Sequence, residues 1–152
     1  MTLKTSPAGL DIIKKFEGFR AKPYRCPAGV ATIGYGSTYY ADGRPVKMTD
    51  APITEAQAQE LLQATLAKYE ACVNGAVKMP INQNQFDAFV SFTYNLGCGA
   101  FRKSTMLQLF NTGYAGAAAE QFAKWNRGGG RVLPGLVARR AAEKALFVKG
   151  VP

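Results

Sequence analysis

The stretch IIKKFEGFRAKPYRCPAGVATIGYGST, residues 12–38, decides the fold. Its first part continues a helix that begins upstream, where Ser6 is a suitable N-cap and Pro7 a suitable first helical residue. Apolar side chains then recur with helical spacing at Leu10, Ile13, Phe16 and Phe19. The pattern predicts an amphipathic helix that ends between Gly18 and Arg20.

The chain changes character over residues 20–48, where glycine and proline are frequent. Between them lie two short runs of β-forming residues, 30–35 and 37–40, and a turn signal follows at 41–43. These features predict a small hairpin or three-stranded sheet directly after the first helix.

Helical patterns fill the rest of the chain. Thr54 with Gln57, and Asn82 with Gln85, are typical of capping boxes at the start of two helices. Shorter helices are expected at residues 104–110 and 115–125, and a last one follows Pro134 after a break at glycines 128–130. This last helix carries a basic face of Arg139, Arg140 and Lys144. We therefore expect an α+β, mainly α, single domain over residues 1–152, with a small β element inserted into a helical body.

Composition limits the function. The chain has 152 residues, 47% of them hydrophobic, which is enough for one core without a metal or disulfides. No apolar run reaches the roughly 18 residues of a membrane span, so stable membrane insertion is not expected, and the first residues lack the pattern of a signal peptide. The net charge of +9 favours a polyanionic partner, either nucleic acid or an acidic cell envelope.

Histidine and cysteine counts argue against metal chemistry. There is no histidine, and the cysteines at 26, 72 and 98 have no CxxC spacing, so we expect neither a metal nor another cofactor. Three cysteines leave at least one free thiol in a single chain, and whether Cys72 and Cys98 pair stays open.

Three polar side chains stand where the first helix turns into the hairpin. They are Glu17, Cys26 and Thr32, separated by eight and five intervening residues. A protonated glutamate near a group that activates water is suited to glycosidic bond cleavage. Spacing alone favours the simpler interpretation, in which Glu17 is a surface acid, Cys26 a packed thiol and Thr32 an ordinary strand residue.

A resemblance favours the catalytic interpretation. The segments IIKKFEGF (12–19), PY (23–24) and ATIGYGST (31–38) resemble the catalytic region of the phage-type lysozymes, glycoside hydrolase family 24. Similar motifs continue in the same order at 85–97, at Phe101 with 104–105, at Trp125 and at 133–143. The resemblance covers residues 10 to 147.

The resemblance implies roles for particular residues. The family signature is a Glu, eight residues, an Asp or Cys, five residues and a Thr, and it falls on Glu17, Cys26 and Thr32. Glu17 would be the general acid, and Cys26 with Thr32 would activate water, although direct attack of Cys26 on the sugar stays open. Where the family commonly has a histidine after its Gly-Tyr-Gly turn, this chain has Ser37.

Four further positions resemble those that line the glycan site of the family: Tyr94, Asn95, Ser104 and Arg139. Arg139 would hold the carboxylate of Glu17 in position. The structural alternatives are that Tyr94 is a core aromatic, that Asn95 and Ser104 are helix caps, and that Arg139 belongs to a solvated basic face.

The resulting expectation is a monomeric endolysin that hydrolyses the β-1,4 bond between N-acetylmuramic acid and N-acetylglucosamine in bacterial peptidoglycan. The resemblance further implies accumulation in the host cytoplasm and release to the wall through a holin lesion. One alternative is a non-catalytic peptidoglycan-binding module of the same fold. A nucleic-acid binder is less well supported, because the cations are spread along the chain instead of clustering on one element.

Overall fold

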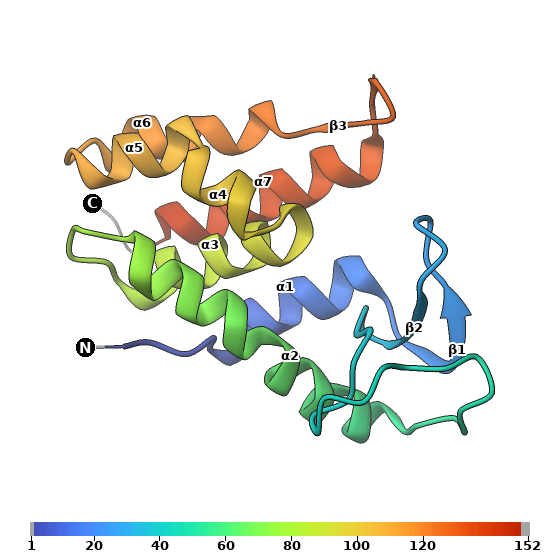
Figure 1. Ribbon diagram of the computed structural model, residues 1–152. Coiled ribbons are helices and arrows are strands. Elements are labelled where there is room, and N and C mark those ends of the chain that lie inside the picture. The colour runs from blue at the N-terminus through green and yellow to red at the C-terminus, as the bar shows by residue number, and fades with distance from the viewer. Residues whose placement is uncertain (1, 150–152) are drawn as a thin grey trace. The chain divides into compact units, whose positions relative to one another are not determined.

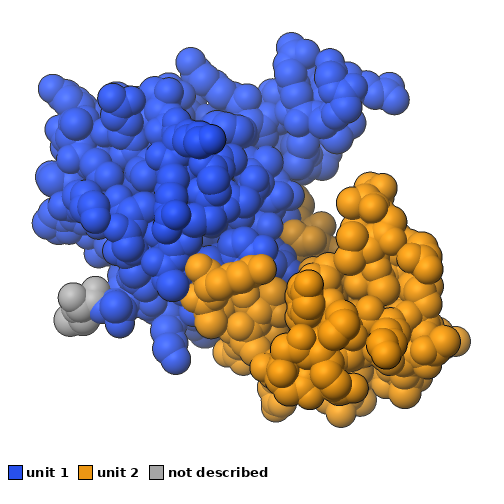
Figure 2. All heavy atoms as spheres, viewed as in Figure 1, with its two compact units in different colours: residues 1–12, 69–152 blue, residues 13–68 orange. Residues whose placement is uncertain are grey.

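The computed structural model describes residues 2–149 and is mainly helical (Figure 1). The chain forms two compact units, one built from residues up to 12 and from 69 onward, the other from residues 13–68 (Figure 2). The α+β, mainly α, fold class is confirmed, while the single domain over residues 1–152 stays a prediction. None of the helices in residues 2–149 is both long and apolar enough to cross a bilayer.

Helix α1 (Pro7–Glu17) begins where the sequence predicts and ends one residue before the predicted range of 18–20, so Phe19 lies outside it. The Ser6 carbonyl accepts from the Leu10 amide at 3.0 Å, which makes Ser6 the N-cap residue. Its side chain does not cap its own helix, because the Ser6 hydroxyl and amide both donate to the buried carboxylate of Asp87. The helix stops at Glu17 because Gly18 has a φ of +74°, in the left-handed region that glycine tolerates best.

The hairpin consists of β1 (Arg20–Arg25) and β2 (Ala31–Gly34), paired antiparallel. The sequence predicted β2 but missed β1, whose register shifts between Arg20 and Tyr24 where Pro23 interrupts the hydrogen-bond ladder. The strand expected at 37–40 is wrong as a strand, since only isolated bridges occur there, Ile33 with Ser37 and Tyr39 with Pro45. This segment is therefore a series of turns, connected by isolated β-bridges in place of a regular strand.

A small apolar core holds this unit together. Ile33, Val46 and Leu61 are buried, and Tyr40 and Ile53 pack against them. Leu61 belongs to α2 (Glu55–Ala76), whose N-terminal half anchors the loop after the hairpin. The predicted capping box of α2 is present, with Gln57 donating its amide to Thr54 Oγ1 at 3.1 Å and accepting from the Thr54 amide at 2.8 Å.

Tyr40 supports a prediction about alkaline pH. Burial raises the pKa of its phenol to about 12, helped by the hydrogen bond that the phenol donates to Asp50 at 2.7 Å. A raised folded pKa contributes stability that is complete below the ordinary value of 10.0 and is lost as the pH rises toward 12. In urea unfolding, the stability difference between wild type and Tyr40→Phe should therefore narrow above pH 10. A constant difference up to pH 11.5 would contradict this assignment.

The other unit is a mainly helical body with one short β-hairpin. Its elements after α2 are α3 (Gln83–Leu96), α4 (Cys98–Lys103), α5 (Thr105–Asn111), α6 (Ala115–Gln121), the 3-10 helix η1 (Phe122–Lys124), β3 (Arg127–Gly128), β4 (Arg131–Val132) and α7 (Pro134–Val148). The predicted capping box at Asn82 and Gln85 is present at the start of α3. The glycines that were predicted to break the chain form the turn of the β3–β4 hairpin.

Phenylalanine rings fill the core of this unit around α3. The ring of Phe89 lies 5.0–6.2 Å, between centroids, from four other rings, which belong to Phe101, Phe110, Phe122 and Phe147. Separations of this size in tilted or edge-to-face geometry favour aromatic contact beyond simple burial. Because α3 supplies Phe89 and is buried along most of its length, it is the central helix of the unit.

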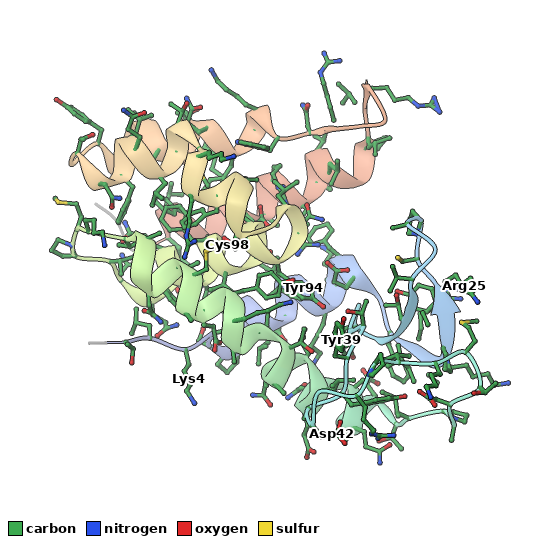
Figure 3. The ribbon with its side chains drawn as sticks, in the orientation of Figure 1. Lys4, Arg25, Tyr39, Asp42, Tyr94 and Cys98 are labelled. Atoms are coloured by element: carbon green, nitrogen blue, oxygen red, sulfur yellow. A yellow bond between two sulfur atoms is a disulfide. The ribbon has the colours of Figure 1, made fainter. Side chains whose placement is uncertain are left out.

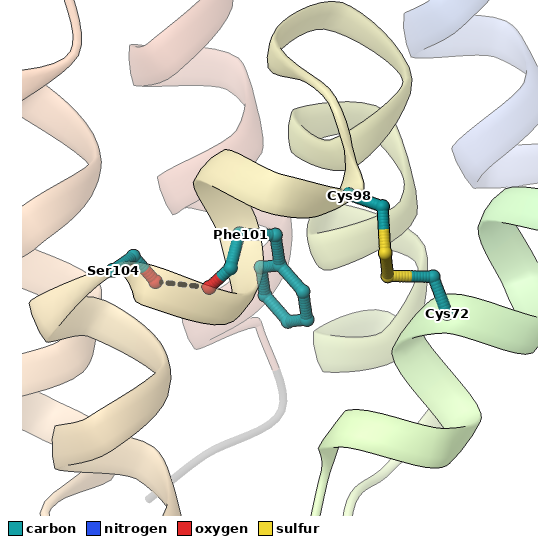
Figure 4. Close-up of a disulfide and its surroundings, with 4 residues drawn as sticks. All are labelled: Cys72, Cys98, Phe101 and Ser104. Carbon is teal, nitrogen blue, oxygen red and sulfur yellow. Dashed lines mark hydrogen bonds between the residues drawn. A yellow bond between two sulfur atoms is a disulfide. The ribbon is translucent and has the colours of Figure 1, made fainter.

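A disulfide answers the open question about cysteine pairing. Cys72, in the C-terminal half of α2, is bonded to Cys98 at the start of α4, with their Cα atoms 6.2 Å apart (Figure 4). The two cysteines are separated by 26 positions in the sequence, and the bond closes the loop between them. Within residues 2–149, Cys26 is left as the free thiol.

Candidate active site

Glu17 is the last residue of α1, and the chain reverses at Gly18 into the hairpin. The Gly18 amide donates to the Lys14 carbonyl at 3.0 Å, so the helix is intact up to the acid. The side chain of Glu17 is half-buried. The helix end therefore presents a carboxyl group just before the hairpin that carries the next two polar residues.

Cys26 opens the turn that joins β1 to β2. The Gly29 amide donates to the Cys26 carbonyl at 2.7 Å, and the Cys26 amide donates to the Val30 carbonyl at 3.0 Å. Gly29 has a φ of +82°, as expected of a three-residue hairpin loop that ends in a glycine bulge. Arg25, labelled at the end of β1 in Figure 3, braces the turn through a 3.0 Å bond to the Gly29 carbonyl.

This turn surrounds the Cys26 sulfur with hydrogen-bond donors. The backbone N–H of Val30 makes the largest contribution to lowering the pKa of the Cys26 thiol below its ordinary value. Desolvation opposes this effect, while the Ala28 N–H, Thr32 and the N–H of Cys26 itself lower the pKa further, so the net change of the pKa is downward. Since the thiolate is the reactive form of cysteine, the turn favours a base or nucleophile at this position.

Thr32 lies on β2, is buried, and forms part of the same cluster. Its hydroxyl donates to the Val30 carbonyl at 2.8 Å, and Thr32 is close enough to the Cys26 sulfur to lower the pKa of the thiol. Cys26 and Thr32 therefore lie near each other at the same end of the hairpin. Both residues belong to one polar site that is formed by the hairpin alone, without contributions from other helices or strands.

Tyr24 connects this site to Glu17, and sequence reasoning missed it. Its phenol pKa is raised first by burial and then by the negative charges of Glu17 and Cys26, so the ring lies within electrostatic range of both groups. Tyr24 and Thr32 are cross-strand partners, which places their side chains on one face of the hairpin. The two-residue spacing between Tyr24 and Cys26 is the signal that could have found it.

Ser37 stands where the family commonly has a histidine, and its hydroxyl is paired. Ser37 is fully buried, and its Oγ lies 2.8 Å from Thr65 Oγ1 on α2. The Thr65 hydroxyl donates to the Leu61 carbonyl at 2.9 Å, so its single proton is used and Ser37 must be the donor between the two. Two neutral groups therefore make the contact at this position.

The remaining predicted site residues lie in the mainly helical unit. The ring of Tyr94, which is labelled in Figure 3, meets the ring of Tyr69 edge to face, with centroids 5.1 Å apart. Asn95 accepts a 2.9 Å hydrogen bond from Arg140. Ser104 caps α5 by accepting from the Leu107 amide at 3.0 Å and donates to the Phe101 carbonyl at 2.7 Å (Figure 4). Contact of these residues with glycan stays a prediction.

Arg139 and Arg140 correct the expectation of a solvent-facing basic surface on α7. Both are buried, with 3% and 1% of their surface exposed. The carboxylate of Glu143 meets Arg139 Nε at 3.3 Å and Arg140 Nε at 2.7 Å. Ser91 on α3 donates its hydroxyl to Glu143 at 2.6 Å and accepts from Arg139. The predicted role of Arg139 beside Glu17 stays a prediction.

Metal-ligand clusters are absent from the described part of the chain. Within residues 2–149, no three side chains among His, Cys, Asp and Glu gather closely enough to hold a metal ion. The polar groups at the hairpin are a carboxyl, a thiol, a hydroxyl and a phenol. These groups suit proton transfer and hydrogen bonding.

A glutamate at the end of the first helix, a short hairpin that carries Cys26 and Thr32, and a mainly helical unit are the features of a protein of the lysozyme type. The family model described as phage lysozyme matches residues 14–143. The chain belongs to this family.

Individual relatives support that membership. The endolysin of Bacillus phage PZA is 44% identical over 152 residues, which cover 99% of this chain and 57% of the relative. The endolysin of Acyrthosiphon pisum secondary endosymbiont phage 1 is 44% identical over 93% of this chain and 96% of its own length. This chain thus spans a little over half of the first relative and nearly all of the second.

Solved structures agree with the fold. An endolysin from Escherichia coli O157:H7 phage FAHEc1 superposes with a TM-score of 0.88 at 41% identity, covering 98% of this chain and 96% of that one. A mutant of P22 lysozyme superposes with a TM-score of 0.87 at 36% identity, covering 97% and 99%. Nearly the whole chain therefore has the arrangement of known phage lysozymes.

Proposed function

We propose that this chain is a muramidase that hydrolyses the β-1,4 bond between N-acetylmuramic acid and N-acetylglucosamine in bacterial peptidoglycan. The observation that carries the proposal is the donor-lined turn around Cys26, on the same hairpin that follows the acid Glu17. Membership of the phage lysozyme family supports the substrate class. The net charge of +9 suits an anionic wall.

In the proposed mechanism, Glu17 gives its proton to the glycosidic oxygen while the bond from that oxygen to the anomeric carbon breaks. The sugar acquires oxocarbenium character, and water adds to the anomeric carbon. The Cys26 thiolate takes a proton from this water, and the Thr32 hydroxyl orients it. Glu17 is left as a carboxylate and Cys26 as a thiol, and exchange of one proton with solvent restores both.

The thiolate has a physical advantage over a thiol in this role. A neutral thiol cannot accept the proton of the attacking water, whereas backbone N–H groups aimed at the sulfur stabilise the anion that can. An aspartate at the same position could accept the same backbone donors, because Asp side chains commonly bond to turn amides two residues onward. This explains in physical terms why Asp and Cys are alternatives at this place in the family signature.

Cys26 variants test the proposal directly. Cys26→Asp should keep the lysis rate within about tenfold of wild type, while Cys26→Ala and Cys26→Ser should lose roughly 10²-fold or more, because neither alanine nor a serine hydroxyl can take up the proton near neutral pH. The measurement is turbidity loss of outer-membrane-permeabilised cells, with the melting temperature as a check on folding. Full activity of a folded Cys26→Ala sample would exclude Cys26 from water activation.

Alkylation of the thiol provides an independent readout. Because Cys72 and Cys98 are bonded to each other, iodoacetamide under non-reducing conditions reports on Cys26 alone. The rate should rise with pH around a midpoint below the ordinary thiol value of 9.0, since the pKa of Cys26 is lowered. Thr32→Val, which removes one donor but keeps the side-chain shape, should move this midpoint upward.

The remaining aspects of the proposal concern partners and location. We propose peptidoglycan as the partner, a monomer as the active form, and action on the wall at host lysis. The names of the relatives, endolysins of bacteriophages, support this setting. Delivery from the host cytoplasm through a holin lesion rests on the resemblance of the sequence alone.

A further inference from the structure

The hydroxyl group of Tyr24 takes no part in the hydrogen bonding of the described residues. No hydrogen bond to this hydroxyl occurs within residues 2–149, although the side chain is half-buried. The neighbouring tyrosines of the same unit differ, because Tyr40 bonds Asp50 at 2.7 Å and Tyr35 bonds Glu55 at 3.0 Å. A partly buried hydroxyl without a protein partner is available to a ligand or to water.

The backbone directs this side chain toward the proposed site. Tyr24 pairs with Thr32 across the hairpin and precedes Cys26 by two residues, so the three side chains share one face. Arg20 stacks on the ring, with its guanidinium carbon 4.3 Å from the ring centroid. This stacking covers one face of the ring and restricts the orientation of the phenol.

Electrostatics keep the phenol protonated. Burial and the charges of Glu17 and Cys26 raise the pKa of Tyr24 above its ordinary value of 10.0 and outweigh the lowering effect of Arg20. At neutral pH the group is therefore a hydrogen-bond donor within electrostatic range of both the proposed acid and the proposed water activator. In a glycosidase, two such groups flank the sugar at which cleavage takes place.

We propose that the Tyr24 hydroxyl donates a hydrogen bond to the sugar whose glycosidic bond is cleaved and thereby positions that sugar between Glu17 and Cys26. The inference rests on the proposed muramidase function and adds a fourth residue to its site. Tyr24 contacts the substrate but takes no part in proton transfer.

The test compares Tyr24→Phe with Tyr39→Phe. Both substitutions remove one hydroxyl from a tyrosine of the same unit. Tyr39 is 56% exposed, and its label in Figure 3 lies away from that of Arg25, which marks the hairpin turn. Tyr24→Phe should lower kcat/KM on soluble peptidoglycan glycan chains about tenfold, the effect of one hydrogen bond, while Tyr39→Phe should match wild type. The melting temperature and the Cys26 alkylation rate should be unchanged in both variants, which shows that the hairpin is intact.

A binding experiment separates this inference from the proposed function. The Glu17→Gln variant is expected not to cleave the glycan, so binding can be measured without turnover. In this background, adding Tyr24→Phe should weaken binding of a purified GlcNAc–MurNAc tetrasaccharide several-fold. If wild type lacks hydrolytic activity but this loss of affinity occurs, the muramidase proposal fails and the sugar contact stands. Wild-type kcat/KM together with unchanged affinity in folded Tyr24→Phe would overturn the assignment of Tyr24. Arg20→Gln, which removes the stacked guanidinium, should give a smaller loss in the same direction.

Discussion

Glu17→Gln is expected to lower the rate of peptidoglycan hydrolysis about 10³-fold, within the range typical of loss of a general acid. The amide keeps the size of the side chain at the end of α1 but has no proton of suitable acidity to give to the glycosidic oxygen. Without that proton, the leaving group must depart as an alkoxide. The turbidity assay and release of reducing sugar ends from soluble glycan both measure this step.

Glu60→Gln is the matched control for this prediction. Glu60 lies on the exposed surface of α2 in the same unit, so the same chemical change should leave activity within about twofold of wild type. Melting temperatures of both variants should remain close to wild type, because Glu17 is only half-buried. A folded Glu17→Gln protein with near-wild-type activity would remove Glu17 from the acid role.

Glu143→Gln is expected to destabilise the protein by about 3–5 kcal/mol, the cost typical of removing one partner from a buried ion pair. Glu143 has no exposed surface, and its carboxylate faces Arg140 Nε at 2.7 Å and Arg139 Nε at 3.3 Å. The amide would leave two buried guanidinium groups without a compensating charge. Urea unfolding followed by circular dichroism measures the change.

An exposed ion pair between α6 and α7 provides the control. Lys144 on α7 and Glu120 are 2.9 Å apart, but the Glu120 side chain is 70% exposed. Exposed pairs contribute roughly 0–1 kcal/mol, so Glu120→Gln should have little effect. A loss below about 1 kcal/mol in Glu143→Gln, equal to that of Glu120→Gln, would mean that the arginines find other partners and that the cluster is not a structural anchor.

Helix boundaries were predictable because their signals are local. The capping boxes at Thr54 and Asn82 and the Ser-Pro start of α1 involve residues within one turn of each other, and all three helices begin there. The strand β1 was not predictable in this way. It contains Pro23 and several cations, and it exists because β2 pairs with it.

The sequence predicted which residues belong to the candidate site better than it predicted the contacts that these residues make. Spacing and resemblance identified Glu17, Cys26 and Thr32, but the donors that stabilise the Cys26 thiolate belong to the turn geometry, which depends on Gly29 at positive φ. The buried state of Arg139 and Arg140 could not be read from the sequence, because a helix of alternating basic and small residues is typical of a solvated face. Glu143 lies one turn further along α7 itself, but only the packing of α3 against α7 brings Ser91 to the cluster and buries it.

The hydrogen bond between Ser37 and Thr65 has a consequence for the conditions under which this part of the fold keeps its shape. It joins the turn after the hairpin to α2 through two hydroxyl groups, neither of which carries a charge at any pH that proteins experience. An imidazole at the same place would gain or lose a proton near neutrality, and a salt bridge would weaken as ionic strength rises. This join is insensitive to both variables, so acidification or a change of salt across a cell boundary leaves it in place.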